Sequence, residues 1–112
     1  MPTIDFYIKK GDTSPAIEGT LLDGNGDAVN LTGATLAFIY KRTDDALPVE
    51  RVATIVTAAS GTVKYEWVEE DTATATYMTA EWEVTFQGGF IATFPNDGNL
   101  IIRVGEEIGS IV

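Results

Sequence analysis

The chain has 112 residues, 45% of them hydrophobic, and contains no cysteine or histidine, which excludes disulfides, thiolate ligands, most zinc sites and triads that need histidine. Seven basic residues against seventeen acidic ones give a formal charge of −10, which opposes binding to nucleic acid and to anionic membranes. We therefore expect one globular domain over residues 1–112 that is not an enzyme, has no cofactor or metal, and binds neither nucleic acid nor membrane.

Apolar and polar residues alternate along much of the chain with the period of two that is typical of β-strands. In chain order, we predict strands at residues 4–8, 16–22, 34–41, 49–57, 62–67, 81–86, 90–94 and 99–104. Turn-forming residues separate these segments, and the only helical segment predicted is a short turn at residues 69–74. The pattern predicts an all-β fold, an antiparallel immunoglobulin-like β-sandwich of about seven strands.

Two of these segments have distinctive side-chain patterns. Phe6 and Tyr7 are neighbours in the first strand, so one of the two rings should point away from the core. Residues 34–41 are apolar on nearly both faces, as expected of a central strand in a two-sheet packing.

The segment Asp23-Gly24-Asn25-Gly26-Asp27 places oxygen-bearing side chains at alternate positions, as a calcium loop does. The glycine and glutamate that a helix-loop-helix calcium site needs at loop positions six and twelve are replaced here by Ala28 and Ala34. Asp-Gly and Asn-Gly between apolar segments form turns, so we predict a hairpin turn.

A second hairpin is predicted around Gly88-Gly89, and its loop length decides which side chains are buried. A two-residue loop would leave Phe90 and Phe94 on the face of the glutamates. A three-residue loop with Gly89 left-handed pairs Phe86 with Phe90, Val84 with Ala92 and Trp82 with Phe94, gathers these four aromatics into the core and sends Glu83 and Thr85 outward. We predict the longer loop.

Paired carboxylates are the usual chemistry of glycoside hydrolysis, and Glu69-Glu70-Asp71 or Asp44-Asp45 could supply them. Adjacent residues on a strand point to opposite faces, and a chain of this size has little room for a cleft that raises one pKa. We interpret these residues as solvated loop acids.

Six aromatic residues could either stack on sugars or fill the sandwich core: Tyr65, Trp67, Trp82, Phe86, Phe90 and Phe94. All fall on one parity of their strands, which favours the core. The alternative function is therefore a carbohydrate-binding module, which requires an exposed aromatic row.

Apolar residues at both ends of the chain are candidate partner contacts. Strand addition at an exposed sheet edge is the expected docking mode for a small sandwich. The predicted partner-binding residues are Ile4, Phe6 and Ile8 in the first strand and Ile108, Ile111 and Val112 in the tail over residues 106–112.

Several segments together resemble the immunoglobulin-like N-terminal domain of phage baseplate upper proteins and related tail modules. They are Gly11-Asp12-Thr13-Ser14-Pro15, Asp23-Gly24-Asn25-Gly26, Val29-Asn30-Leu31-Thr32-Gly33-Ala34, Tyr65-Glu66-Trp67, Asp71-Thr72, Tyr77 with Ala80-Glu81, and Thr93-Phe94-Pro95-Asn96-Asp97-Gly98. The resemblance covers nearly the whole chain, and the order and spacing of the segments carry it.

The resemblance implies a structural protein of the virion, made in the host cytoplasm and placed in the phage tail or baseplate, where it docks other virion proteins. It also implies a homo-oligomer and neither an active site nor a cofactor. A capsid or tail decoration protein is an alternative of the same class.

Overall fold

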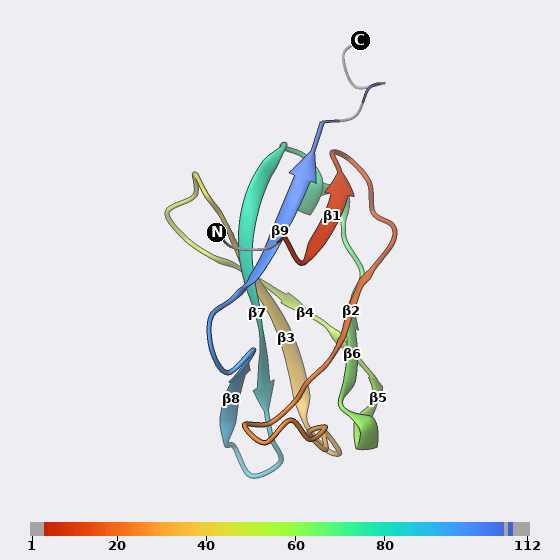
Figure 1. Cartoon of the computed structure of the whole chain (residues 1–112), viewed down its shortest axis with the longest axis vertical. Helices are drawn as coiled ribbons and strands as arrows, with labels where there is room; N and C mark the ends of the chain where they lie inside the picture. Colours follow the sequence, from red (N-terminus) through yellow and green to blue (C-terminus); the bar gives the residue numbers. More distant parts are fainter. Residues whose placement is uncertain (1–3, 107, 109–112) are drawn as a thin grey trace.

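A computed structural model describes residues 4–106 and 108 of the chain (Figure 1). The described residues form nine strands and two short 3-10 helices. They are β1 (Phe6–Lys9), β2 (Ile17–Thr20), β3 (Thr35–Arg42), β4 (Val49–Val52), β5 (Thr54–Thr57), η1 (Ala58–Ser60), β6 (Thr62–Tyr65), η2 (Glu69–Thr72), β7 (Thr76–Thr85), β8 (Ile91–Phe94) and β9 (Leu100–Gly105). The predicted all-β fold is confirmed, and η2 confirms the helical turn expected near residue 69.

Two sheets face each other as a sandwich (Figure 1). The larger sheet has the order β1-β9-β7-β3-β4, with β8 also paired to β7, and the smaller one has the order β2-β6-β5. The strand pairs are antiparallel, as predicted, except β1 with β9, which run parallel. Among the described residues, no helix is long and apolar enough to cross a membrane.

The long strand β7 has different partners along its two halves. Residues 76–80 pair with β9 and residues 82–85 pair with β8. The connecting residues 95–99 leave the sheet between these two partners. β8 and β9 therefore lie end to end along one side of β7, and β1 extends the sheet only beyond β9.

The single strand predicted at residues 49–57 is two strands in different sheets. β4 pairs with β3, and β5 pairs with β6. The chain crosses between the sheets at Ala53, whose N–H still donates to the Leu36 carbonyl at 3.1 Å. Burial alternates without a break from residue 49 to residue 56, so side-chain parity does not reveal the crossing.

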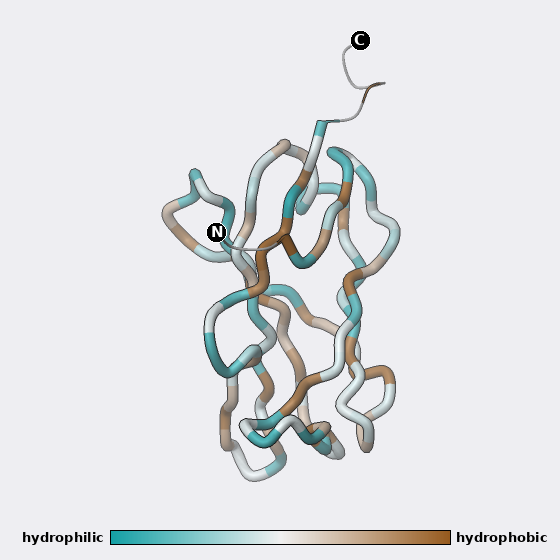
Figure 2. The backbone as a smooth tube through the Cα atoms, viewed as in Figure 1, coloured by the Kyte–Doolittle hydropathy of each residue, from teal (hydrophilic) through white to brown (hydrophobic). Residues whose placement is uncertain are grey.

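The core lies between the sheets and is rich in aromatic rings. Phe38 is at its centre, with its ring centroid 4.9 Å from that of Tyr65 and 4.8 Å from that of Trp82. Tyr7 points to solvent while Phe6 packs against Trp67, as predicted for that neighbouring pair. The hydropathy alternates along the strands, whereas the loop at residues 23–27 is hydrophilic (Figure 2).

The Gly88-Gly89 hairpin has the predicted longer loop. Trp82 pairs with Phe94 and Val84 with Ala92, and Gly89 has a positive φ of 91°. Phe90, however, is 75% exposed, so its predicted place in the core was wrong. Parity aims the ring inward, but at the tip of the hairpin it lies beside Gly88 rather than under the opposite sheet.

The Asp23–Asp27 segment forms the predicted tight turn. The Asp23 carboxylate accepts hydrogen bonds from the N–H groups of Asn25 at 2.8 Å and Asp27 at 3.0 Å. Leu22 and Ala28 form an antiparallel bridge across its base. One oxygen of Asp23 is thus used to hold the backbone of its own turn.

Candidate functional site

An apolar cleft of about 290 Å³ opens between the two sheets, where β8 is succeeded by β9. Its apolar walls are Phe6, Ile17, Leu21, Trp82, Phe94 and Leu100. The cleft exists because residues 95–99 leave the large sheet opposite β2. Asn96 donates to the Leu22 carbonyl at 3.2 Å across one end. An opening of this size and character can accept an apolar side chain from a partner.

The predicted partner-binding residues of the first strand have different environments. Phe6 borders the cleft, and Ile4 is half-buried. Ile8 is 5% exposed and belongs to the core, so its side chain stabilises the fold and cannot serve as the contact that was predicted. β1 does lie at the edge of the larger sheet, as strand addition requires.

The predicted residues of the tail are only partly described. Ile108 is 91% exposed, whereas Ile111 and Val112 lie outside the described residues. The structure therefore brings Phe6 to a cleft and leaves Ile108 apart from it. Their contact with a partner stays a prediction.

Asp71, predicted to be a solvated loop acid, is fully buried, and that prediction was wrong. Its carboxylate accepts hydrogen bonds from the hydroxyls of Tyr40 and Tyr65, both at 2.5 Å, and from the Val68 N–H at 2.9 Å. Arg51 adds a bond from Nε and an ion pair from Nη2, each at 3.1 Å. The short helix η2 turns the side chain inward by placing Asp71 three residues after Val68.

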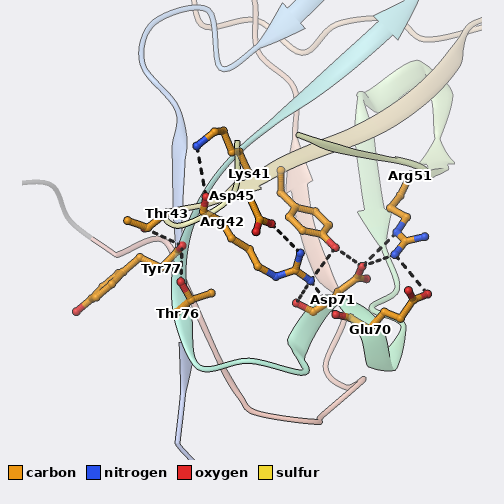
Figure 3. Close-up of polar contacts among 10 residues, drawn as sticks. Lys41, Arg42, Thr43, Asp45, Arg51, Glu70, Asp71, Thr76 and Tyr77 are labelled. Carbon is orange, nitrogen blue, oxygen red and sulfur yellow. Dashed lines mark hydrogen bonds and ion pairs between the residues drawn. The ribbon is translucent and has the colours of Figure 1, made fainter. Parts of the chain in front are cut away.

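A second arginine secures the backbone of the same helix. Arg42 donates from Nη2 to the Glu70 carbonyl at 2.7 Å and to the Asp71 carbonyl at 3.2 Å, and its Nη1 pairs with Asp45 at 3.1 Å. Figure 3 shows Arg42 and Arg51 approaching Asp71 from opposite sides. The cluster thereby ties β3, β4, β6 and η2 together.

The electrostatics of this cluster oppose acid catalysis. Burial alone would raise the pKa of Asp71, but the hydrogen bonds from both tyrosines and Val68, with the Arg51 charge, outweigh it and hold that pKa below its ordinary value. Burial and the neighbouring carboxylate raise the pKa of Tyr40 to about 12 and also raise that of Tyr65. Asp71 thus stays ionised while the tyrosines stay protonated, an arrangement suited to holding structure together.

Sequence reasoning missed this cluster, although a signal for it was present. Tyr40 and Tyr65 share the parity of buried residues on their strands, and a buried tyrosine hydroxyl needs a hydrogen-bond partner. An acid in the loop after residue 67 is the nearest such partner in the sequence. The geometry of η2 decides which of the three acids, Glu69, Glu70 or Asp71, points inward to the tyrosines.

The aromatic residues that could have formed a sugar-binding platform are mostly inside. Tyr65, Trp67, Trp82 and Phe94 are buried, and Phe86 is half-buried. Phe90 is the exposed member of the six. The row of exposed rings that a carbohydrate-binding module requires is therefore not formed by these residues.

The side chains present offer few ligands for a metal. Within residues 4–106 and 108, no three His, Cys, Asp or Glu residues are grouped so that they could hold a metal ion. Asp71, the most buried acid, already accepts bonds from four partners. What the described surface offers is places for contact: an apolar cleft, a free sheet edge and exposed sheet faces.

Comparisons with known proteins find a structural likeness alone. No family model matches the chain, and no curated protein matches it. Among solved structures, the N-terminal domain of phage TP901-1 ORF48 is similar, with a TM-score of 0.65 and 18% sequence identity over 96% of this chain and 90% of that one. At this identity the likeness shows a shared fold.

Proposed function

We propose that this chain is a structural protein of a phage virion, a β-sandwich module that acts by binding other virion proteins and catalyses no reaction. The observation that carries the proposal is the fold likeness to a phage protein domain over nearly the full length of both chains. The sequence segments that resemble the baseplate upper protein domain support the same class of role, and favour a place in the tail or baseplate.

The chemistry of the surface is consistent with docking. The edge strand β1 has backbone groups free for strand addition, and the cleft bordered by Phe6 can receive an apolar side chain of the added segment. The tail over residues 106–112 supplies further apolar residues. We propose Ile4, Phe6, Ile108, Ile111 and Val112 as the contacts that join the module to its neighbours.

Incorporation into particles tests this function. Phage particles are purified on a density gradient, and the protein is quantified by immunoblot across the fractions. The proposal predicts that the protein sediments with intact particles at a constant ratio to the capsid protein. Protein found wholly in the soluble fractions of a productive lysate would contradict it.

A truncated chain tests the proposed contacts. Deletion of residues 106–112 should leave the circular dichroism spectrum unchanged, because it removes no part of the nine strands that the structure describes, and should reduce incorporation about tenfold or more if the tail is an anchor. Replacing exposed Leu47, on the β3–β4 loop, by serine is the matched control and should incorporate normally. Normal incorporation of the truncated chain would remove the tail from the proposed interface.

A further inference from the structure

The outward side of the larger sheet carries an ordered pattern of charge. Alternate residues of each strand point away from the core and define what we call the outer face. These are Tyr7, Lys9, Thr35, Ala37, Ile39, Lys41, Glu50, Val52, Tyr77, Thr79, Glu81, Glu83, Thr85, Ile91, Thr93, Ile101 and Arg103. The strand registers arrange them in rows that run across the strands.

One half of the outer face is basic and aromatic. Tyr7, Arg103 and Tyr77 form one row across β1, β9 and β7, and the Arg103 guanidinium lies 4.6 Å from the centre of the Tyr77 ring. Both tyrosines are exposed, Tyr7 to 68%. Lys9 follows Tyr7 on β1, and Lys41 lies opposite Thr79 in the next row.

The other half is acidic, with apolar residues between the carboxylates. Glu50 and Glu81 flank Ile39 in one row across β4, β3 and β7. Glu83 lies in the following row, which ends at Val52, 90% exposed on β4. A shallow groove of about 480 Å³ runs over this half.

The charges of the outer face balance but do not pair within one molecule. Three of the seven basic residues and three of the seventeen acidic ones lie on it, so the formal charge of −10 resides on the rest of the chain. Within the described residues, no ion pair joins Lys9, Lys41 or Arg103 to Glu50, Glu81 or Glu83. The face is thus neutral as a whole and divided into two halves of opposite sign.

We propose that the outer face binds the outer face of a second copy of this chain, with the strands of the two copies antiparallel. A face with two halves of opposite charge is complementary to itself when it is turned end over end, which is the condition for a two-fold symmetric contact. A two-fold axis parallel to the strands would place like charges together. The axis must therefore lie across the strands.

The rows determine which residues meet. An axis between the row of Thr79 and the row of Glu81 places the row of Tyr77 and Arg103 over the partner copy's row of Glu83. The same rotation places Lys41 over Ile39, between Glu81 and Glu50. Tyr77 then lies over Glu83 of the partner copy, and Arg103 lies over Thr93, beside that carboxylate.

The choice of a second copy over an unrelated basic partner follows from the charge distribution. A basic protein would be drawn to the rest of the surface, where all of the net negative charge resides, and would be repelled by Lys9, Lys41 and Arg103. For two copies, the rest of the surface is mutually repulsive and the outer face is neutral. Self-association through the outer face does not depend on the virion role.

Sedimentation equilibrium of the full chain tests the inference first. At concentrations up to about 1 mM, the wild-type mass should rise from that of a 12.0 kDa monomer toward twice that value. A mass that stays monomeric over this range would overturn the inference, and the outer face would then be free for a different partner.

Reciprocal charge reversals test the geometry. Arg103→Glu and Glu83→Arg should each weaken self-association about tenfold or more, because each creates two like-charge contacts in the symmetric pair. An equimolar mixture of the two variants should associate again, since opposite charges then face each other across the mixed pair. Association that neither reversal weakens, or a mixture that stays monomeric, would rule out this face as the contact.

Two control variants make the same charge reversals on the smaller sheet, away from the outer face. Glu18→Arg on β2 and Lys64→Glu on β6 should leave self-association unchanged. Circular dichroism confirms that each variant is folded. Failure of self-association with normal particle incorporation would refute this inference alone, whereas self-association without incorporation would refute the virion role alone.

Discussion

Asp71 is held by donors from four parts of the chain. Tyr40 on β3, Arg51 on β4, Tyr65 on β6 and the N–H of Val68 all reach its carboxylate. A buried carboxylate with this many partners stabilises the fold only while it is ionised. Because its pKa is lower in the folded chain than its ordinary value of 3.8, its contribution is fully present above pH 3.8 and is lost as the pH falls below 3.8 through the lower pKa of the folded chain.

Asp71→Asn should destabilise the protein by about 2–4 kcal/mol at pH 7, because the bonds from Arg51 and the tyrosines lose the charge of their acceptor. The free energies of unfolding of wild type and variant are compared by urea denaturation. Their difference should shrink as the pH is lowered below about 4. Glu70→Gln, at an exposed neighbour, is the control and should change stability by no more than about 0.5 kcal/mol. A difference that is constant with pH would contradict this account of Asp71.

The raised pKa values of the two tyrosines in this cluster predict that the protein loses stability at alkaline pH. Tyr40 has a pKa of about 12 in the folded chain against 10.0 ordinarily, and that of Tyr65 is also raised. A raised pKa gives stability that is complete below about 10 and is lost as the pH rises toward the folded value. The melting temperature should therefore fall steeply between these pH values, and less steeply in Tyr40→Phe. Equal slopes for the two proteins would contradict the role given to Tyr40.

At the scale of strands, period-two alternation predicted most of the strands. It did not predict which inward-pointing side chains the opposite sheet covers. The β7–β8 register follows from the Gly88-Gly89 loop and was predicted residue by residue. The exposure of Phe90 was not, because parity says which way a side chain points and not whether anything covers it. The crossing at Ala53 was hidden because side-chain parity continues from β4 into β5, and only the partner strands differ.

Two phenylalanines of the β7–β8 hairpin allow the effect of burial on stability to be compared directly. Phe94→Ala should destabilise the protein by about 3–5 kcal/mol, because Phe94 is buried in the core. Phe90→Ala should change stability by no more than about 0.5 kcal/mol, since its ring is already in solvent. Urea denaturation measures both. Similar losses for the two variants would show that Phe90 is packed after all.

Gly61, between η1 and β6, combines a left-handed backbone with close packing around its Cα. Gly61 has a φ of 67°, and a Cβ there would lie 2.7 Å from the Val29 carbonyl oxygen. Gly98 has a similar φ of 72° with open space around it. Gly98→Ala should cost about 1–2 kcal/mol from the backbone alone, and Gly61→Ala clearly more. Equal losses in thermal unfolding would mean that the contact at Gly61 is relieved at no cost.

At the scale of the molecule, the fold class was predicted from the sequence, and the surfaces were not. The outer face combines residues from β1, β3, β4, β7, β8 and β9, whose order in the sheet does not follow their order in the chain. The Asp71 cluster depends likewise on contacts between β3, β4, β6 and η2. Alternation supplies the parity of each strand, but the neighbours are set by topology, which separate strand patterns do not specify.

The polarised outer face and the apolar cleft lie on different parts of the sandwich. One chain could therefore hold a second copy through the outer face and a different virion protein along β1. A subunit that binds both another copy of itself and a different protein needs two separate surfaces of this kind.

The measurement that tests the virion role most directly is immunogold electron microscopy of purified phage particles, with an antibody against this protein. We expect gold at one defined place on the particle, namely the tail tip if the resemblance to baseplate proteins holds for its position. Label along the shaft or on the head would keep the virion role and place the protein in a tube or decoration position. Particles without label, when the same antibody detects the protein in the lysate and its epitope is accessible on the folded chain, would contradict the account.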